Sequence, residues 1–459
     1  MEKIKADVFI LGAGAGGTGL AYFLASNGIK TAVCDQNPYF GGTSVYSGVN
    51  CWEPGVSFDG LHLVLKDYLL KSGGGFVCKS YPNGSFLNPK LKNDWSSNDF
   101  SKYCWGYSDF DPDGRYEDTL KRCKMFFASS GVYKRFQFDD SAMTNALRAV
   151  FAPLNNNLIP LFGRSFADVK HKDGAVRSVI LSDGTEVEAK VFADCTGNII
   201  LARCAGCDHT IGSEGAEDYG EPSAGRRSDS INGVTYVFRV SKTDDPSYVD
   251  PLPPDIPEVG FNKNTVSCFN VYPGGDVNIN MLPTMDGNRY FGGEHENCIA
   301  IVRRYWNYLQ LEKGLSGFRL KKIFAPGIRE SYRLKGRYIL TENDLVTGVF
   351  RQKDPERFAA VADHMRDIHG SGGLSKELET PFGIPLETLE TKEFDNLFVC
   401  SRGASFSHIA ASSARLTRTL ISAGEGLGSF LAADFFGKSN DDLLISRKST
   451  INKWRNIYE

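Results

Sequence analysis

The sequence predicts an α/β fold with a Rossmann-like domain and a second, β-rich α+β unit. Three observations predict it. The chain starts with a strand, a glycine turn, a helix and a strand, in "DVFILGAGAGGTGLAYFLASNGIKTAVCD". Its 459 residues exceed what one hydrophobic core usually serves. Finally, strand-like stretches separated by Pro/Gly loops fill the range from about 207 to 328.

The glycine turn of the first unit predicts a dinucleotide site. Gly12 permits the tight turn, Gly14 lets the backbone approach a pyrophosphate, and Gly17 lets the helix pack closely on the strand. Asp35 follows about 20 residues later, where an acid binds a ribose. A side chain at position 14 should block the ligand. The alternative is a glycine-rich turn that holds no ligand.

This unit alone does not distinguish NAD from FAD, which use the same phosphate contacts. Directly after Asp35, "QNPYFGGTSVYSG" brings Gly41, Gly42 and Thr43, whose N–H groups can reach a second face of the pyrophosphate. Much later, "GTEVEAKVFADCTGN" runs as a strand into Thr196 and Gly197. A last strand, a loop and a long amphipathic helix follow in "FDNLFVCSRGASFSHIAASSARLTRTLISAGEGLGSFLAADFF".

Together these segments resemble the FAD-binding parts of the glutathione-reductase superfamily. Within it, the chain resembles the FAD-dependent oxidoreductase family of bacterial flavoproteins, through "GGTSVYSGVNCWEPG", "FADCTGN", "PGIRESYRLKGRYILTENDL" and "IPLETLETKEFDNLFVCSRGASFSHIA". The resemblance is weak over 76–131 and 214–317. It implies FAD, held non-covalently. It also makes Arg402 a flavin or phosphate contact, where many relatives have Asp, the alternative being a salt-bridged surface arginine.

The resemblance also implies that the Rossmann-like FAD-binding domain is discontinuous. We expect it to consist of 1–75, 132–206 and 381–437, with a substrate or cap domain and its helical connection inserted at 207–380. Residues 76–131 are an aromatic-rich insertion, either a substrate lid or a loop with its own small core. Residues 438–459 form a C-terminal tail.

Strands and helices can be placed within these ranges. "SAMTNALRAVFAPLNNN" is helical, and the next four stretches are strands that turn at Asp-Gly pairs 173–174 and 183–184. In the inserted domain the pattern predicts strands at "VTYVFRV", "TVSCFNVY", "DVNINML" and "FRLKKIFA", and a helix at "ENCIAIVRRYWNYLQLE".

Two residues are candidates for catalysis. His408 starts a helix whose N-terminus, by the resemblance, faces the flavin's pyrimidine edge; it acts as acid or base, or only packs nearby. Arg329 can bind a substrate carboxylate or a developing alkoxide, the alternative being an ion-pair network in which Glu330 pairs with Arg333. Tyr332 is a further proton donor by proximity alone.

Several site types are disfavoured. Cys51 stands alone, without the second cysteine of a dithiol, and no second G-x-G-x-x-G offers a nicotinamide domain. Cys204 and Cys207 have redox or zinc spacing, but we interpret them as small buried hydrophobes, and we predict no metal site. His364 and His369 lie five residues apart, off one helical face.

Composition excludes further classes of protein. With a net charge of −3 and scattered Lys and Arg, the chain has no electrostatic footprint for nucleic acid. No apolar run is long enough to cross a membrane. Eleven cysteines in a large chain, without a signal peptide at the start, indicate reduced thiols and a cytoplasmic protein.

The expected activity is hydride transfer between FAD and a small organic substrate, at an alcohol, an amine or an activated C–C bond, with a sugar-derived acid as one candidate. The second electron partner and the oligomeric state stay open. Two alternatives remain: a non-catalytic FAD-binding or redox-sensing protein, and a flavoprotein of tRNA modification, which the lack of a basic stripe disfavours.

Overall fold

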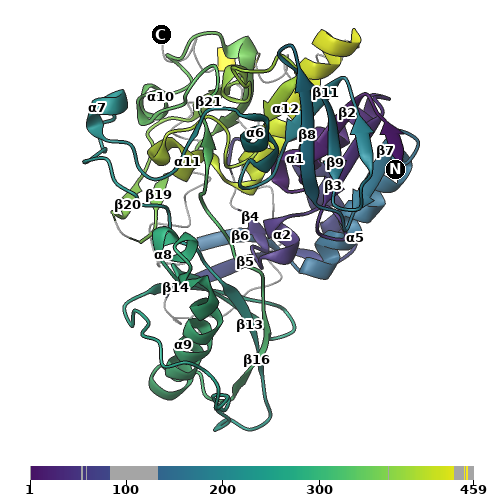
Figure 1. The fold of residues 1–459 in the computed structure, drawn as a ribbon. Coiled ribbons are helices and arrows are strands. Elements are labelled where there is room, and N and C mark those ends of the chain that lie inside the picture. The colour runs from purple at the N-terminus through teal and green to yellow at the C-terminus, as the bar shows by residue number, and fades with distance from the viewer. Residues whose placement is uncertain are drawn as a thin grey trace.

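The computed structural model describes residues 2–52, 55–57, 59–82, 133–370, 372–438, 449 and 451–452. Figure 1 shows an upper part built around a parallel sheet and a lower part built around an antiparallel sheet and one long helix. Of the aromatic-rich range 76–131, only 76–82 fall within the described residues, in a strand. The rest of that range, and most of the predicted tail 438–459, lie outside them.

The upper part contains a five-stranded parallel sheet that confirms the predicted Rossmann-like fold. Its order is β22-β11-β2-β3-β7. The strands are β2 (Val8–Leu11), β3 (Thr31–Asp35), β7 (Leu158–Phe162), β11 (Val191–Asp194) and β22 (Leu397–Val399). Every residue of β2 is buried, as expected for an apolar strand covered on both faces. Because these strands come from distant segments, the domain is discontinuous in sequence.

The first and last long helices of the described chain pack against each other beside this sheet (Figure 1). They are α1 (Ala15–Ser26) and α12 (Thr417–Phe436). A Cβ added at Gly19 would lie 2.1 Å from the carbonyl oxygen of Ile421, and one at Gly424 would lie 2.2 Å from that of Gly16. Both glycines are therefore required for the two backbones to touch.

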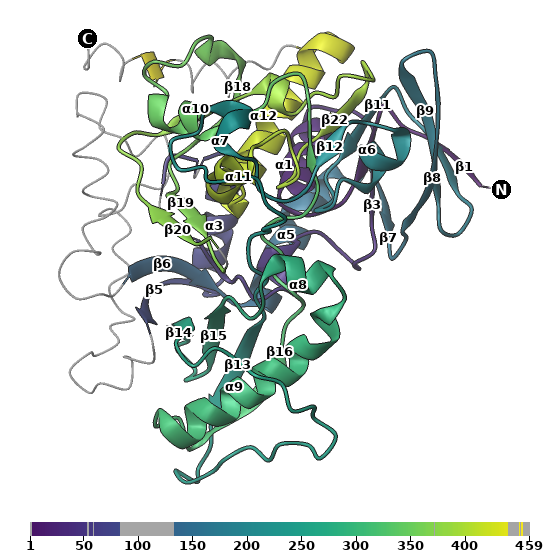
Figure 2. The same ribbon diagram turned by 60° about the vertical axis from the view of Figure 1, so that its left-hand side comes forward.

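A second sheet lies at the outer edge of the upper part (Figure 2). Its order is β1-β10-β9-β8, formed by β1 (Lys3–Lys5), β8 (Phe166–Lys172), β9 (Ala175–Leu181) and β10 (Glu186–Glu188). The predicted turn at 173–174 is present, with positive φ at Asp173 and Gly174. The stretch "EVEAKVFAD", expected as one strand, forms two strands in different sheets, β10 and β11.

The lower part is built on a seven-stranded sheet of order β16-β13-β15-β14-β5-β6-β4. Its strands are β4 (Cys51–Trp52), β5 (Gly75–Pro82), β6 (Tyr133–Phe138), β13 (Val237–Lys242), β14 (Val266–Val271), β15 (Val277–Leu282) and β16 (Phe318–Ile323). β4 and β6 thus join this sheet although they fall in the ranges 1–75 and 132–206. The proposed domain boundaries stay a prediction.

Three adjacent strands of this sheet, β13, β15 and β14, turn large apolar side chains to one face. Phe238, Phe269 and Ile279 belong to a hydrophobic core shared with α9 (Cys298–Glu312). The residues between them point the other way, and they include Asn270 and Asn280. The polar face is therefore turned away from α9 and towards the upper part.

The other elements connect these parts. The helices are α2 (Thr43–Tyr46), α3 (Leu61–Lys71), α5 (Asp140–Phe151), α6 (Ile200–Ala205), α7 (Ala216–Tyr219), α8 (Gly287–Phe291), α10 (Glu342–Thr347) and α11 (His408–Ala414). Short strand pairs are β12 (His209–Thr210) with β17 (Arg333–Leu334), β18 (Phe358–Ala362) with β21 (Phe382–Pro385), and β19 (Arg366–Ile368) with β20 (Leu374–Lys376). None of the described helices combines the length and hydropathy needed to cross a bilayer.

Candidate functional site

A cavity of about 790 Å³ extends from the carboxyl edge of the parallel sheet to the polar face of the seven-stranded sheet. The parallel-sheet end includes Gly12, Gly14 and Asp35. The opposite end includes Val237, Cys268, Asn270, Asn280 and Leu282. Ligands of open α/β sheets bind at this edge, and the volume suits a dinucleotide together with a small molecule.

The three glycines of the first turn lie where the sequence predicts. Gly12 has a φ of +100°, and its added Cβ would lie 2.7 Å from the backbone of Cys195. An added Cβ at Gly17 would lie 1.9 Å from the carbonyl oxygen of Gly12. Gly14, the N-cap of α1, has only one such neighbour, at 3.9 Å. Gly12 and Gly17 are thus needed for packing, whereas Gly14 leaves space at a helix N-terminus, where anions bind.

Asp35 lies at the end of β3 and lines the cavity. Its Oδ2 accepts the N–H of Ala13 at 2.7 Å, and its Oδ1 accepts the N–H of Asn37 at 2.8 Å. Oδ1 also accepts from the Asn37 Nδ2 at 2.9 Å, so the acceptor position that remains is on Oδ2. Asp35 therefore stabilises the glycine turn and still has acceptor capacity for a ribose hydroxyl.

The loop after β3 contributes only part of what the sequence predicts. Gly42 and Thr43 line the cavity at the start of α2. Gly41 does not line the cavity, and its N–H donates a hydrogen bond to the carbonyl oxygen of Ala13 at 3.1 Å. This corrects the expectation for Gly41, whose N–H is unavailable to a phosphate.

Thr196, Gly197 and Arg402 meet at the middle of the cavity. The Thr196 hydroxyl donates to Asp194 at 2.6 Å, so it shapes the turn after β11. An added Cβ at Gly197 would lie 2.0 Å from the Arg402 guanidinium, which therefore lies directly on this glycine. Arg402 has no ion pair among the described residues, and its buried Nε has no hydrogen-bond partner there. Burial, with Arg415 nearby, lowers the pKa of Arg402 to about 10.

The C-terminal segment contains two helices, and the second one faces the cavity. In α11, the N–H of His408 donates to Glu214 at 2.8 Å and that of Ala410 to Ser407 at 3.1 Å, so its N-terminus is capped by the protein. The chain then breaks at Arg415 and Leu416, and the 20-residue helix α12 begins. Residues 416–418 line the cavity, and no side chain caps this N-terminus. The helix end expected at His408 is thus provided by α12.

His408 lies outside the lining of the cavity, in a buried cluster of charges. Its Nδ1 contacts Glu330 at 2.9–3.0 Å, and Glu330 also pairs with Arg333. Burial favours the neutral form of Glu330, but the charges of His408 and Arg333 hold its pKa below the ordinary value. The expected alternative, an ion-pair network, is what this segment forms. An acid–base role for His408 stays a prediction without a contact to the cavity. Tyr332 also lies outside the lining, 3.4 Å beneath the Arg203 guanidinium.

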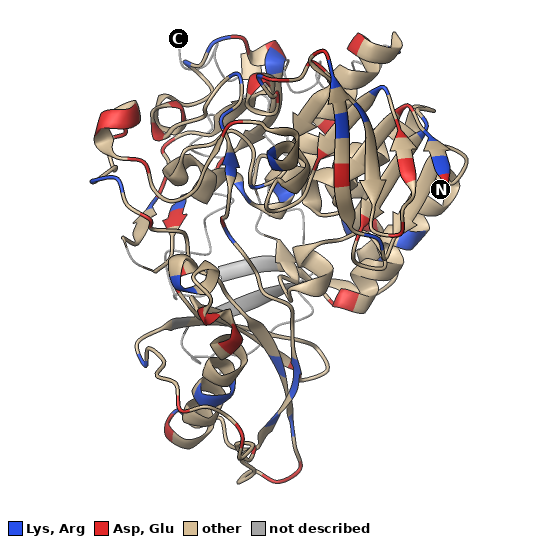
Figure 3. Cartoon of the chain, viewed as in Figure 1, with Lys and Arg blue, Asp and Glu red and all other residues tan. Residues whose placement is uncertain are grey.

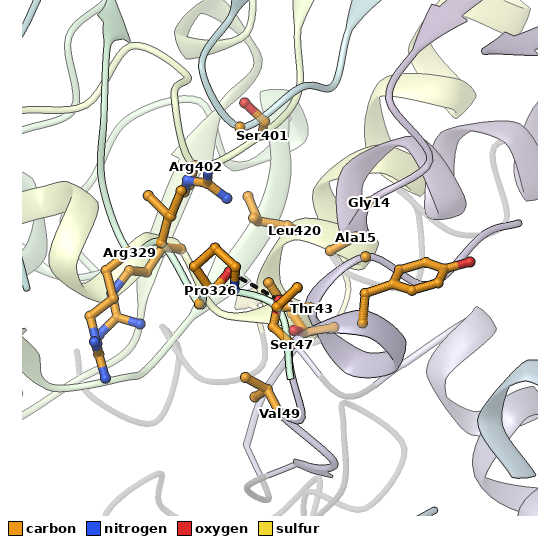
Figure 4. Close-up of a pocket in the computed structure, with 18 of the residues that line it drawn as sticks. Gly14, Ala15, Thr43, Ser47, Val49, Pro326, Arg329, Ser401, Arg402 and Leu420 are labelled. Atoms are coloured by element: carbon orange, nitrogen blue, oxygen red, sulfur yellow. Dashed lines mark hydrogen bonds between the residues drawn. The ribbon is translucent and has the colours of Figure 1, made fainter. Parts of the chain in front are cut away.

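Arg329 does line the cavity, and Figure 4 shows it with Arg402 on the side opposite Gly14 and Ala15. Its Nη1 donates to the carbonyl oxygen of Gly233 at 2.7 Å and to the Thr235 hydroxyl at 2.6 Å. No carboxylate of the described chain lies within ion-pair distance of it. Burial, and then the charge of Arg415, lowers the pKa of Arg329 to about 9. The guanidinium is thus held in place, charged at neutral pH, and able to bind an anion.

Sequence reasoning missed a constellation at the same end of the cavity, formed by His369, Asp367 and Arg415. His369 Nε2 lies 2.9 Å from Asp367 Oδ2, and Arg415 Nη2 donates to that oxygen at 3.0 Å. Burial opposes ionisation of Asp367, but His369 and Arg415 hold its pKa below the ordinary value. Burial lowers the pKa of His369, although Asp367 acts in the opposite direction. "MRDIHG" alone gives no signal of this group, because Arg415 joins it from a distant helix.

The cysteines of the described chain form no disulfide. Cys204 is exposed and Cys207 is buried, and burial raises the pKa of Cys207 well above its ordinary value. Cys51 lines the cavity beside Asn270, whose Nδ2 lies 3.7 Å from its sulfur. No cluster of three or more metal-ligating side chains occurs in the described ranges.

A family model described as "FAD dependent oxidoreductase" matches residues 7–438. The chain belongs to this FAD-dependent oxidoreductase family. It is therefore a flavin enzyme whose cofactor is FAD, as the sequence predicts.

Individual relatives of this FAD-dependent oxidoreductase are distant. A 52-residue stretch is 41% identical to 3-oxosteroid 1-dehydrogenase from Rhodococcus opacus, but it covers 11% of this chain and only 10% of that enzyme. The solved flavin-dependent brominase Bmp2 matches 98% of this chain and 84% of its own, with 11% identity and a TM-score of 0.48. A geranylgeranyl bacteriochlorophyll reductase-like protein from Thermoplasma acidophilum matches 98% and 86%, with 13% identity and a TM-score of 0.44.

The cavity of the FAD-dependent oxidoreductase fits its cofactor. The space at Gly14, the N-terminus of α1 and Arg402, which has no ion pair among the described residues, suit a pyrophosphate and its ribitol. Asp35 suits the adenosine ribose. The helix N-terminus at residues 416–418 suits the flavin ring, since a helix N-terminus stabilises a reduced anionic ring.

Proposed function

We propose that the chain transfers a hydride between FAD and a small organic substrate that carries, or develops, negative charge. One observation carries the proposal. Arg329 is fixed by Gly233 and Thr235, faces the cavity, and has no acidic partner in the described chain. The guanidinium is half-buried and Asp367 acts on it only from beyond ion-pair distance, so an anion in the cavity would stabilise it, and its planar fork suits a carboxylate or an alkoxide. The Arg329–anion contact is our proposal for substrate binding.

His369 is the side chain that we propose as proton acceptor. When neutral, it donates from Nε2 to Asp367, which leaves Nδ1 with a free lone pair. Asp367 fixes this tautomer and stabilises the charge that forms on the ring. Arg415 holds Asp367 in turn. His369 replaces His408 in this role because it lines the cavity.

We propose a separate role in the reaction for FAD, for His369 and for Arg329. FAD, when bound, accepts the two electrons of a hydride from the substrate carbon. His369 takes the proton from the adjacent hydroxyl or amine group, and Arg329 stabilises negative charge on the substrate. Other polar side chains that line the cavity hold the substrate in the orientation that hydride transfer requires.

The test is anaerobic mixing of the purified FAD-loaded protein with alcohols, amines and hydroxy acids, followed by the loss of flavin absorbance. We expect at least one anionic donor to bleach the flavin. Arg329→Met should slow bleaching by at least 10²-fold, and Arg329→Lys should retain part of the rate. FAD content is measured for each variant.

Arg351→Met is the matched control, because Arg351 is exposed and does not line the cavity. It should bleach at the unchanged rate. If the protein binds FAD but no donor bleaches it, the proposal fails and a non-catalytic FAD-binding role gains support. If Arg329→Met bleaches as fast as the original protein, the role of Arg329 is wrong.

A further inference from the structure

We infer that the polar face of the seven-stranded sheet binds the hydroxyl groups of a polyhydroxylated carboxylate. Asn270 and Asn280 are the hydroxyl-binding residues, and Arg329 takes the carboxylate. This inference rests on the proposed function, because it names the substrate class of the same cavity.

Two unsatisfied acceptors mark this face as a binding surface. Asn270 is only 6% exposed, and its Oδ1 has no hydrogen-bond partner among the described residues. The buried Oδ1 of Asn280 has none either. Both residues line the cavity. A buried polar atom without a partner costs free energy, so two of them on one cavity wall indicate a ligand that supplies the missing bonds.

The neighbouring Asn278, on the same face of the sheet, has hydrogen-bond partners for both its oxygen and its nitrogen. Its Oδ1 accepts from Arg239 at 2.7 Å, and its Nδ2 donates to Asn50 at 3.0 Å. Asn278 does not line the cavity. Amides on this sheet are thus satisfied where protein covers them and unsatisfied where the cavity begins.

The chemistry of an amide selects hydroxyl groups. A primary amide has an acceptor oxygen and two donor hydrogens. Among the described residues, the Asn270 Nδ2 contacts the sulfur of Cys51 at 3.7 Å, which is a weak acceptor. A hydroxyl both donates and accepts, so it satisfies both ends of an amide. An ammonium only donates, and an ether only accepts.

The positions of the three groups require a substrate of some length. Arg329 donates a hydrogen bond to the hydroxyl of Thr235, which lies two residues before Val237 in the chain. Val237 pairs across strands with Asn280, and Asn280 pairs with Cys268, two residues before Asn270. Two residues of extended chain advance the backbone by about 7 Å. A carboxylate at Arg329 and hydroxyls at the asparagines therefore belong to a chain of several carbon atoms.

The experiment titrates the anaerobic FAD-loaded protein with gluconate, galactonate and xylonate, with sorbitol and with hexanoate. Binding is followed by the perturbation of the flavin spectrum, and turnover by its bleaching. We expect at least one aldonate to bind at least tenfold more tightly than sorbitol, which lacks the carboxylate, and than hexanoate, which lacks the hydroxyls.

Variants locate the contacts. Asn270→Ala and Asn280→Ala should each weaken aldonate binding about tenfold, while leaving hexanoate binding unchanged. Arg329→Met should weaken the binding of the aldonates and of hexanoate, but not the binding of sorbitol. Asn264→Ala is the matched control: it removes an exposed amide of the same sheet region and should change nothing.

The outcomes separate this inference from the proposed function. If no aldonate binds better than sorbitol or hexanoate, or if the asparagine variants bind it as tightly as the original protein, the inference is wrong. Bleaching by another anionic donor in that same protein would still support hydride transfer. If no donor of any class bleaches the flavin, the proposed function fails as well.

Discussion

At the scale of single residues, Gly14 and Gly17 belong to one motif but have different roles. Gly17 packs on Gly12, whereas the position of a Cβ on Gly14 is open. We expect Gly14→Val to fold and to lose FAD, because its side chain would occupy the phosphate space. Its free energy of unfolding without FAD should stay within about 1 kcal/mol of the original. The ratio of flavin to protein absorbance measures the loss.

Gly17→Ala is the contrasting variant for that experiment. Its Cβ would lie 1.9 Å from the Gly12 carbonyl oxygen, so it should destabilise the protein in the absence of FAD. Equal FAD content in Gly14→Val and the original protein would show that the pyrophosphate does not pass this turn.

The ionisation of His369 should determine how kcat/KM falls at low pH. Because burial lowers its pKa below 6.5, kcat/KM should rise with pH through a midpoint below that value and then level off. In Asp367→Asn the midpoint should move lower still, because Asp367 raises the pKa of His369, and the plateau should fall. The measurement is the pH profile of flavin reduction.

His369→Gln should abolish this fall at low pH and lower the plateau by 10² or more. His171→Gln changes an exposed histidine of β8 and should leave the profile unchanged. A His369→Gln enzyme with the original profile would assign the proton to another group, and His408 would then be the next residue to change.

Sequence reasoning reached those residues whose role is local. The turn formed by Gly12, Gly14 and Gly17, and Asp35 beside it, can be predicted because it is encoded within one strand–helix–strand unit; their contacts with FAD stay a prediction. Gly41 was misassigned because the bond to Ala13 depends on tertiary packing. The trio of His369, Asp367 and Arg415 assembles from two distant segments, so no local pattern predicts it. Asn270 and Asn280 left a signal that was overlooked: asparagines that alternate with apolar residues along two strands.

At the scale of elements, the N-terminus of α12 is the feature that the sequence concealed. The run from 408 to 436 reads as one amphipathic helix, and only the packed structure reveals the break at 415–416. The predicted strands β13, β14, β15 and β16 and the helix α9 are confirmed, because their periodicity reflects a single buried face.

This helix end should set the reduction potential of the bound flavin. Leu416→Asp places a carboxylate at the N-cap of α12, beside the cavity. It should stabilise the helix but disfavour an anionic reduced ring. We expect the midpoint potential to fall by roughly 10 to 30 mV, since 30 mV corresponds to about 1.4 kcal/mol in a two-electron couple. Redox titration measures it.

Leu416→Asn is the neutral control, because it caps the helix without adding charge. Its potential should stay near the original value. An equal shift in both variants would mean that lost packing of Leu416, and not charge, acts on the flavin.

At the scale of the whole molecule, the cavity lies between two hydrophobic cores. One surrounds the parallel sheet and includes Trp52, Phe136 and Phe138 of β4 and β6, and the other joins β13, β14 and β15 to α9. FAD bound between them should couple their unfolding. We expect calorimetry to show one transition for the loaded protein and two for the protein without FAD, with a gain of about 2.7 kcal/mol at a hundredfold excess of FAD over its Kd.

Excess free phosphate and adenosine provide the control, because neither can reach both cores at once. Two transitions in the loaded protein would show that the cofactor binds one part only. Basic and acidic residues of the described chain are mixed over both parts in the view of Figure 3. This agrees with the net charge of −3.

The contact between α1 and α12 has a consequence for the order of events in the cell. The glycine turn before α1 is synthesised before β22 and α12. Until those two elements emerge from the ribosome, the parallel sheet lacks an edge strand and the cavity lacks a wall. The cofactor can therefore be captured only after α12 has emerged, and a nascent chain arrested before β22 should remain colourless.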